Sequence, residues 1–201
     1  FIIVVRKYKE VIMQHFSADE SYFEYLDRIG KTAERKMMEK FLQKVSDSEI
    51  IFVPSIPNGF GGAVLSAEKY VHTDYVYIAA PDIIIPNKDF LIHHTKNHNY
   101  ILTSFSQNPE KYGVVYGNDT VTLIEEKPVN PKSNRIFLAY AMLSKEIFDF
   151  LKEEKPDPKG EIQLTPAISR MATKVPIYIV EVPKFYDIGT PQGYLTLIRG
   201  Y

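Results

Sequence analysis

The alternation of short apolar strands with helical segments constrains the fold of this chain more than any other feature of its sequence. Residues 75–80 are uniformly apolar, as expected of a strand that is covered on both faces. Such alternation is typical of βαβ units, and therefore predicts an α/β chain with a parallel or mostly parallel sheet. We predict strands at residues 1–5, 49–53 and 75–80, and helices at residues 7–16, 31–45 and 63–70.

Two connections in this half carry specific expectations. Ser17 is expected to begin a further helix, because Glu20, three residues later, completes a capping box. Residues 54–62 contain three glycines and two prolines, and we expect them to form a loop before the helix at 63–70.

The second half of the chain has a different character. Short strands at 114–116 and 121–124 flank the turn "GND", which is typical of a hairpin. Because no linker rich in glycine and serine interrupts the chain, we interpret residues 1–201 as a single α/β domain with an added mixed β region. Further strands are predicted at 136–143 and 176–182, and helices at 144–152, 161–172 and 191–199.

Composition excludes several classes of protein. The 201 residues carry a net charge of −1, which gives no field that would gather nucleic acid or an anionic membrane. The chain has no cysteine, which excludes disulfides and cysteine metal sites and fits a cytoplasmic protein. The longest apolar run, residues 74–86, is too short to span a bilayer. The start "FIIVV" is typical of a strand and not of a signal peptide, and we expect further residues upstream of Phe1.

Gly30-Lys31-Thr32 resembles the end of a phosphate-binding loop. Tyr25 occupies the position of the first glycine of that motif, so the match fails. A turn followed by the start of a helix is the simpler interpretation.

The segment "PNGFGGAV" is better placed, because it lies between a predicted strand and a predicted helix. Gly59, Gly61 and Gly62 would let the backbone pass close to a ligand with its N–H groups turned outward. Val64 stands where a dinucleotide fingerprint has its third glycine, and a tight connection without a ligand is an equal alternative.

Charged residues gather where three strands end. Asp82 follows the apolar strand at 75–80, Glu126 and Lys127 precede Pro128, and Asp187 lies in "FYDIGTP". Ligands of α/β sheets bind at the carboxyl ends of the strands. Two carboxylates there can hold Mg²⁺ against phosphates, and a lysine can neutralise a phosphate. Carboxyl groups that share one ion should lie within about 4–6 Å of each other.

Each of these groups also has a structural alternative. Asp82 is equally well explained as the cap of a turn or helix, and Asp187 alone as part of a capping loop before Pro191. Glu126 and Lys127 alone would be a solvated turn.

Three histidines form a weaker candidate for a metal site. His94 and His98 are one helical turn apart, with His93 beside them. No glutamate lies between them in the position that a zinc protease requires, so we expect a solvated helix end.

Seven segments, in order and spacing, resemble the sugar-1-phosphate nucleotidyltransferases, and most closely the UTP–glucose-1-phosphate uridylyltransferases. They are "IIVVRKYKEVIMQHF", "GGAVLSAEKYV", "APDIII", "NPEKYGVV", "EEKPVNPKSN", "GEIQLTPAI" and "YDIGTPQGY". The resemblance covers essentially the whole chain. It implies a Rossmann-like doubly wound, mostly parallel sheet with an added mixed β region, of the nucleotide-diphospho-sugar transferase type, lacking its first strand here.

The same resemblance implies an activity. A nucleoside monophosphate would pass from UTP or dTTP to glucose 1-phosphate or a related sugar 1-phosphate, giving a nucleotide sugar and pyrophosphate. Asp82 and Asp187 would hold the catalytic Mg²⁺ and Lys127 would bind the sugar phosphate, so that these three residues are the expected catalytic set.

The remaining substrate contacts are also implied by the resemblance. Glu126 would bind sugar hydroxyls, Gly113 and the backbone around Phe137 would contact the hexose, and Asn134 would belong to the same substrate site. The loop from Gly59 to Gly62 would approach the nucleotide. We also expect a homo-oligomer, a dimer or a tetramer, in the cytoplasm, without nucleic acid or membrane as a partner.

The chain departs from the family at three places. A glycine-rich loop with an arginine and a later Pro-Lys pair, which grips the triphosphate in the family, has no counterpart, so we expect the domain to be incomplete at its N-terminus. Ala139 replaces a glycine near the sugar, and Pro166 replaces an aspartate after "GEIQLT". These departures favour an alternative, a non-catalytic regulatory or assembly subunit. Retention of Asp82, Asp187 and Lys127 favours the enzyme.

Overall fold

The computed structural model describes residues 1–6, 9–55, 58–91 and 97–200, and it divides into two compact units. Unit 1 comprises Phe1–Pro57 and unit 2 comprises Asn58–Tyr201, and each is described by itself. The interpretation of residues 1–201 as one domain stays a prediction.

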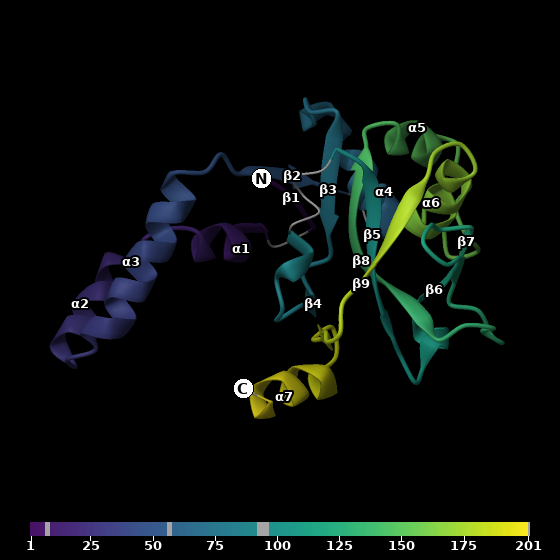
Figure 1. Cartoon of the computed structure of the whole chain (residues 1–201). Coiled ribbons are helices and arrows are strands. Elements are labelled where there is room, and N and C mark those ends of the chain that lie inside the picture. Colours follow the sequence, from purple (N-terminus) through teal and green to yellow (C-terminus); the bar gives the residue numbers. More distant parts are fainter. Residues whose placement is uncertain (7–8, 56–57, 92–96, 201) are drawn as a thin grey trace. The chain divides into compact units, whose positions relative to one another are not determined.

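Unit 1 contains two parallel strands joined by three helices (Figure 1). Strands β1 (Ile2–Val5) and β2 (Ile51–Pro54) pair in parallel, with Val4 opposite Val53. A parallel pair requires a long crossover, and α1 (Lys9–His15), α2 (Glu20–Arg28) and α3 (Thr32–Ser46) supply it. The strands predicted at 1–5 and 49–53 and the helix predicted at 31–45 are confirmed to within two residues.

The predicted start of α2 at Ser17 is wrong. The cap is Asp19, whose carboxylate accepts the backbone N–H of Tyr22 at 3.1 Å. The Ser17 hydroxyl instead donates to the carbonyl of Met13 at 3.1 Å, at the end of α1. Aspartate is at least as good a cap as serine, and its position two residues later shortens the helix.

The sheet of unit 2 is organised around one long strand, β8 (Arg135–Ser144). Its hydrogen-bonded order is β7-β6-β8-β5-β9, and β3 also pairs with β8 (Figure 1). The strands β3, β5 and β6 all lie antiparallel to β8, whereas β5 and β9 are parallel to each other. The bounds are β3 (Tyr75–Ala79), β5 (Asn99–Phe105), β6 (Gly113–Tyr116), β7 (Leu123–Glu126) and β9 (Ile177–Glu181).

This pairing refines the expected mostly parallel sheet. Strands β3, β5 and β9 point the same way, as in a mostly parallel sheet, but β8 lies between β3 and β5 and runs the opposite way. The parallel strands are therefore joined to the β6–β7 hairpin by an antiparallel strand, which is the added mixed region that the sequence predicts.

Strand β5 was not predicted from the sequence, although it lies at the centre of the sheet. Asn99, Thr103 and Ser104 interrupt its apolar run, and all three are buried. The Ser104 hydroxyl donates to Val182 O at 2.9 Å, and Asn99 Oδ1 accepts the N–H of Ser144 at 2.6 Å. Neighbouring strands thus provide hydrogen bonds for two of these polar side chains, an arrangement that no local pattern reveals.

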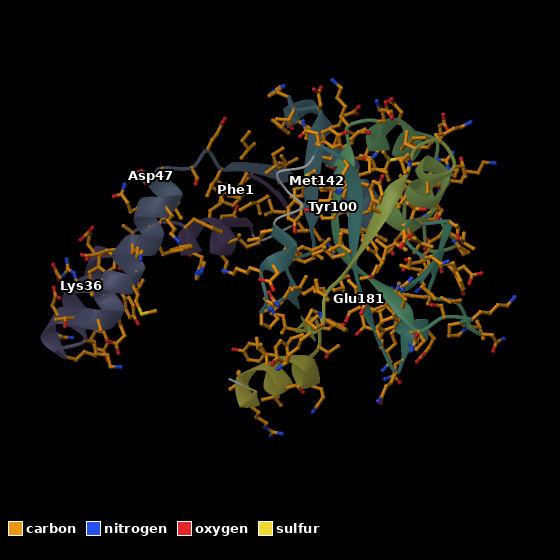
Figure 2. All side chains as sticks on the ribbon, in the orientation of Figure 1. Phe1, Lys36, Asp47, Tyr100, Met142 and Glu181 are labelled. Atoms are coloured by element: carbon orange, nitrogen blue, oxygen red, sulfur yellow. The ribbon has the colours of Figure 1, made fainter. Side chains whose placement is uncertain are left out.

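The core of unit 2 forms two clusters, one on each face of the sheet. Ile101 belongs to one cluster, whereas its neighbours Tyr100 and Leu102 belong to the other, as the two-residue period of a strand requires. Tyr100 lies opposite Met142 of β8 in the middle of the sheet (Figure 2). Helices α4 (Gly59–Ser66), α5 (Ile147–Lys152) and α6 (Leu164–Ala172) contact one another and cover the face of Ile101.

Several smaller elements complete unit 2. Residues 54–62 were predicted as a loop, but α4 already begins at Gly59 and is followed by the 3₁₀ turn η1 (Glu68–Tyr70). The turn η3 (Pro109–Lys111) leads into β6. The short strands β4 (Ile83–Ile84) and β10 (Tyr186–Asp187) pair antiparallel, and α7 (Pro191–Arg199) has the predicted bounds.

Candidate active site

The carboxylates of Asp82 and Asp187 converge above Gly189. Pairing of β4 with β10 sets Asp187 opposite Ile83, and Asp82 O accepts the N–H of Ile188 at 2.8 Å. A Cβ added at Gly189 would lie 2.9 Å from Asp82 Oδ2 and 3.2 Å from Asp187 Oδ1. Both distances are measured from the same added Cβ, so the two oxygens lie no more than about 6 Å apart. This agrees with the expected separation.

Asp187 does not itself cap the helix that follows it. The cap of α7 is Thr190, whose side chain accepts the N–H of Gly193 at 3.1 Å. Asp187 lies in the loop that leads to this cap, as the structural alternative expected, and its carboxylate is not the capping group.

Asp187 is held by two donors. Its Oδ2 accepts the phenol of Tyr112 at 2.9 Å, and its Oδ1 accepts the N–H of Gly189 at 3.0 Å. Burial, and then the hydrogen bond to Asp187, raise the pKa of Tyr112 to about 12. The phenol is therefore a neutral donor at ordinary pH and orients the carboxylate without adding charge.

Glu126 is positioned from two sides. It ends β7 opposite Gly113 of β6, and its Oε2 accepts the hydroxyl of Thr165 at 2.8 Å. A Cβ on Gly113 would lie 2.9 Å from Thr165 Cγ2 and 3.5 Å from Glu126 Oε2, so this position leaves little room for a side chain. Gly113 and Glu126 are thus neighbours, as the sequence predicts, and Thr165 of α6 fixes the carboxylate between them.

Lys127 has an unusual backbone conformation. Its φ of 45° lies in the left-handed region, which costs a side-chain-bearing residue about 1–2 kcal/mol. The N–H of Lys127 donates to Tyr112 O at 3.0 Å, and Nζ lies 3.6 Å from Glu126 Oε1. The Lys127 side chain is 63% exposed, so the ammonium is open to an anionic partner. Strain of this kind gathers at functional sites.

The glycines of α4 have a structural role that the sequence did not predict. A Cβ on Gly59 would lie 2.6 Å from Ile162 O, and one on Gly61 would lie 2.9 Å from the same oxygen. The N–H groups of Gly61 and Gly62 both donate to Ile162 O, at 2.9 and 3.3 Å. The expectation that they turn outward is therefore wrong for these two residues, because the chain at 161–163 occupies that side.

Two further predicted substrate residues, Phe137 and Asn134, make no contact with the carboxylates or the lysine described above, among the contacts found for the described residues. Phe137 is buried in the core cluster that contains Ile101, so only its backbone is available to a ligand. Asn134 lines a shallow depression with Ser106, Gln107, Pro109, Pro131, Lys132 and Ser133. Their roles as hexose contacts stay predictions.

The two family departures inside the described residues are compatible with the fold. Ala139 has a φ of 55°, at the irregularity where the pairing of β8 with β5 shifts register. Glycine is the usual residue at such an angle, which explains why one would be common there. Pro166 is the third residue of α6, where the N–H has no partner within the helix.

The remaining sequence candidates do not form sites among the described residues. Gly30 has a φ of 73° between α2 and α3, which confirms the simple turn. His93 and His94 lie outside the described residues. The predicted helix end also lies outside the described residues. His98 directly precedes β5, and its ring packs edge-on against Tyr178 with 5.2 Å between centroids.

Sequence reasoning missed Tyr112 and Thr165 as site residues. Tyr112 is separated by 75 residues from Asp187, and Thr165 by 39 from Glu126. Tyr112 lies in the motif "NPEKYGVV" and Thr165 in "GEIQLTPAI", and these motifs were the only signal that pointed to the two residues.

The residues present fit a divalent cation. The pair of carboxylates meets over a glycine, where any side chain would crowd both. Two carboxylates are a common protein share for Mg²⁺, which takes its other ligands from water and substrate phosphates. Within residues 1–6, 9–55, 58–91 and 97–200, no three histidine or acidic side chains are grouped to hold a metal, so substrate and water would complete such a site.

Comparison with known proteins identifies the family of the chain. The model of a family described as "Nucleotidyl transferase" matches residues 2–201. The bifunctional protein GlmU of Methanocaldococcus jannaschii is 34% identical over 141 residues, which are 69% of this chain and 34% of that protein. The UTP–glucose-1-phosphate uridylyltransferase of Staphylococcus haemolyticus is 26% identical over 212 residues, covering 96% of this chain and 73% of that protein.

Solved structures show the same fold. The crystal structure of an apo UDP-glucose pyrophosphorylase matches with a TM-score of 0.84 at 21% identity, covering 100% of this chain and 80% of that one. The predicted nucleotide-diphospho-sugar transferase fold is thereby confirmed. The chain spans between 34% and 45% of the length of three of the curated relatives that it matches. In the part of the chain that the structure describes, every helix is too short or too polar to cross a membrane.

Proposed function

Because the chain belongs to the nucleotidyl transferase family, we propose that it transfers a nucleoside monophosphate from UTP or dTTP to a sugar 1-phosphate. Glucose 1-phosphate is the proposed acceptor, and a nucleotide sugar and pyrophosphate are the products. The observation that carries the proposal is the convergence of Asp82 and Asp187 over Gly189, with Tyr112 linking Asp187 to Lys127.

The chemistry requires positioning and charge neutralisation more than a covalent nucleophile. An oxygen of the sugar phosphate attacks the α-phosphorus of the nucleoside triphosphate in line, and pyrophosphate leaves. Lys127 offers an exposed ammonium to the sugar phosphate, where it offsets the repulsion between the two anionic substrates.

Glu126 is the proposed contact for the sugar hydroxyls. Its Oε2 already accepts the Thr165 hydroxyl, so Oε1 is the oxygen left to accept from a sugar. Lys127 Nζ lies 3.6 Å from that oxygen, which places the proposed phosphate contact beside the proposed hydroxyl contact.

Asp82 and Asp187 are the proposed ligands of Mg²⁺, with water and substrate phosphates as its other ligands. When bound, the ion would neutralise charge on the phosphates and orient them. The chain's own contribution is to orient both carboxylates, and the two donors to Asp187 do this for one of them.

The alternative of a non-catalytic subunit rested on the missing triphosphate loop and on the replacements at 139 and 166. Ala139 and Pro166 both occupy backbone positions that the fold accommodates, so neither favours a loss of activity. We further propose a homo-oligomer in the cytoplasm, on the grounds of the family resemblance, the absence of cysteine and the low net charge.

A substrate matrix tests the proposal. The full-length protein, including the residues expected upstream of Phe1, is incubated with Mg²⁺, UTP or dTTP, and a series of hexose 1-phosphates, and pyrophosphate and nucleotide sugar are measured together. Equal release of both products with glucose 1-phosphate supports the proposed reaction. If the protein binds UDP-glucose tightly but turns over none of the substrate pairs, the non-catalytic alternative is favoured.

A further inference from the structure

Tyr112 makes contacts at both ends that join two parts of the candidate site. Its phenol donates to Asp187 Oδ2 at 2.9 Å, and its backbone carbonyl accepts the N–H of Lys127 at 3.0 Å. One residue therefore contacts a proposed metal ligand through its side chain and the proposed phosphate contact through its backbone.

The ring of Tyr112 is itself fixed in place. The N–H of Tyr112 donates to Pro109 O at 3.0 Å, which closes the turn η3. Its ring meets Phe185 edge-on, with 6.3 Å between centroids and 90° between planes. The backbone hydrogen bond and the contact with Phe185 together fix the ring, so the phenol points toward Asp187 in one direction.

Asp187 depends on that phenol for its orientation. One carboxylate oxygen, Oδ1, accepts the N–H of Gly189 and faces the convergence with Asp82. The other, Oδ2, accepts from Tyr112. With Oδ2 released, the hydrogen bond from the N–H of Gly189 would remain to hold the carboxylate against rotation about its last side-chain bond, a torsion that is broad and has no strong preference of its own.

We propose that Tyr112 is a positioning residue that holds Asp187 in the orientation needed to bind a divalent cation, an inference that rests on the proposed function. Partners that orient a metal ligand typically account for about 10- to 100-fold in metal affinity. The backbone contact of Tyr112 with Lys127 does not depend on the phenol, so the two connections can be separated by substitution.

The test compares two substitutions of the same kind. Tyr112→Phe removes only the hydroxyl and keeps the ring against Phe185 and the carbonyl at Lys127. Tyr116→Phe is the matched control, because Tyr116 ends strand β6, which begins directly after Tyr112, and donates its phenol to Glu125, a carboxylate outside the proposed machinery. Asp187→Asn reports whether the cation binds at the proposed place.

Binding of Mn²⁺ alone is measured by electron paramagnetic resonance, without turnover, alongside the thermal midpoint of each variant. We expect Tyr112→Phe to raise the Kd for Mn²⁺ about 10- to 100-fold, and Tyr116→Phe to change it by less than about twofold. In steady-state kinetics, Tyr112→Phe should raise the Mg²⁺ concentration for half-maximal rate and leave the KM for sugar phosphate nearly unchanged.

The outcomes separate this inference from the proposed function. A Kd for Mn²⁺ within about twofold of wild type in Tyr112→Phe, with binding lost in Asp187→Asn, would overturn the role of Tyr112 only. Unchanged binding in Asp187→Asn, or no binding to the wild type, would overturn both this inference and the proposed metal site. The expected Mn²⁺ pattern in a protein that forms no nucleotide sugar would support the inference and overturn the proposed reaction.

Discussion

Lys127 combines a strained backbone with an exposed ammonium. A solvated turn lysine has no need of a left-handed φ of 45° directly before Pro128, and the hydrogen bond to Tyr112 holds the strain in place. The sequence could suggest the function of this lysine through its motif, but not its conformation, because that depends on a carbonyl 15 residues away in the chain.

We expect Lys127→Ala to lower kcat/KM for the sugar 1-phosphate by roughly 10²–10³. The size corresponds to the loss of one charge-assisted contact with a phosphate, in line with comparable electrostatic contacts in other enzymes. The thermal midpoint should change little, because alanine bears the same left-handed strain as lysine. Steady-state kinetics with varied sugar phosphate checks this.

Two further variants calibrate that result. Lys127→Arg should restore only part of the rate, because a planar guanidinium cannot occupy the position of an ammonium. Lys132→Ala removes another exposed lysine from the same loop and should leave kcat/KM within about twofold, since surface substitutions usually change free energies by less than about 0.5 kcal/mol. Equal effects of Lys127→Ala and Lys132→Ala would return Lys127 to the status of a turn residue.

At the scale of elements, α6 secures the strand that carries Glu126. The Ser169 hydroxyl accepts the N–H of Ile124 at 2.7 Å and lies 3.0 Å from the carbonyl of Thr165. Thr165, one turn earlier on α6, bonds Glu126 itself. Because residues four apart lie on one face of a helix, a single face of α6 contacts β7 at two places.

We expect Ser169→Ala to lower the free energy of unfolding by about 1–3 kcal/mol, because it leaves the buried N–H of Ile124 without a partner. Thr173→Ala serves as the control, since it removes an exposed hydroxyl that donates to Arg170 O at the end of the same helix. Chemical denaturation of the three proteins is the measurement. A Ser169→Ala protein as stable as the Thr173→Ala protein would show that β7 is secured by other contacts.

Elements with a strong local signal were predicted closely. Pro191 and the apolar period that follows it gave α7 its observed bounds, and β1 and β8 agree to within one residue. The errors fall where tertiary contacts override local pattern. Strand β5 owes its polar residues to partners on β8 and beyond β9, and the glycines of α4 owe their presence to the backbone at 161–163.

The candidate site was likewise predictable only where its residues carry a local signal. The strand-end position of Asp82 is a local feature, whereas the convergence with Asp187 comes from pairing of β4 with β10, two strands of two residues each. Strands so short carry no readable period. Before the structure, Asp82 and Asp187 were connected only by their expected positions at strand ends and by the family resemblance.

At the scale of the whole molecule, four tyrosines of unit 2 should make the free energy of unfolding decrease at alkaline pH. Burial raises the pKa of Tyr100 and of Tyr112 from 10.0 to about 12, and it also raises the pKa of Tyr77 and Tyr140. A group whose pKa is higher in the folded state than in the unfolded state stabilises the folded state. This contribution is fully present at pH values below the pKa of the unfolded state. That contribution is lost as the pH rises through the folded value.

The free energy of unfolding should therefore decline between pH 10 and pH 12. Denaturant titrations at a series of pH values measure the decline, and tyrosinate absorbance follows the ionisation in parallel. A Tyr77→Phe/Tyr140→Phe protein should show a shallower slope, because fewer phenols differ between the two states. A flat free energy across this interval would contradict the raised pKa values of these phenols in the folded state.

The account as a whole assigns one chemical event to the site, the attack of a sugar-phosphate oxygen on the α-phosphorus of a nucleoside triphosphate. Its most direct test follows an isotope: glucose 1-phosphate carrying heavy oxygen in its phosphate is incubated with unlabelled UTP, Mg²⁺ and the protein, and the products are weighed by mass spectrometry. The account predicts that UDP-glucose retains all of the heavy phosphate oxygens and that pyrophosphate contains none. Heavy oxygen in pyrophosphate, or free phosphate in place of UDP-glucose, would contradict it.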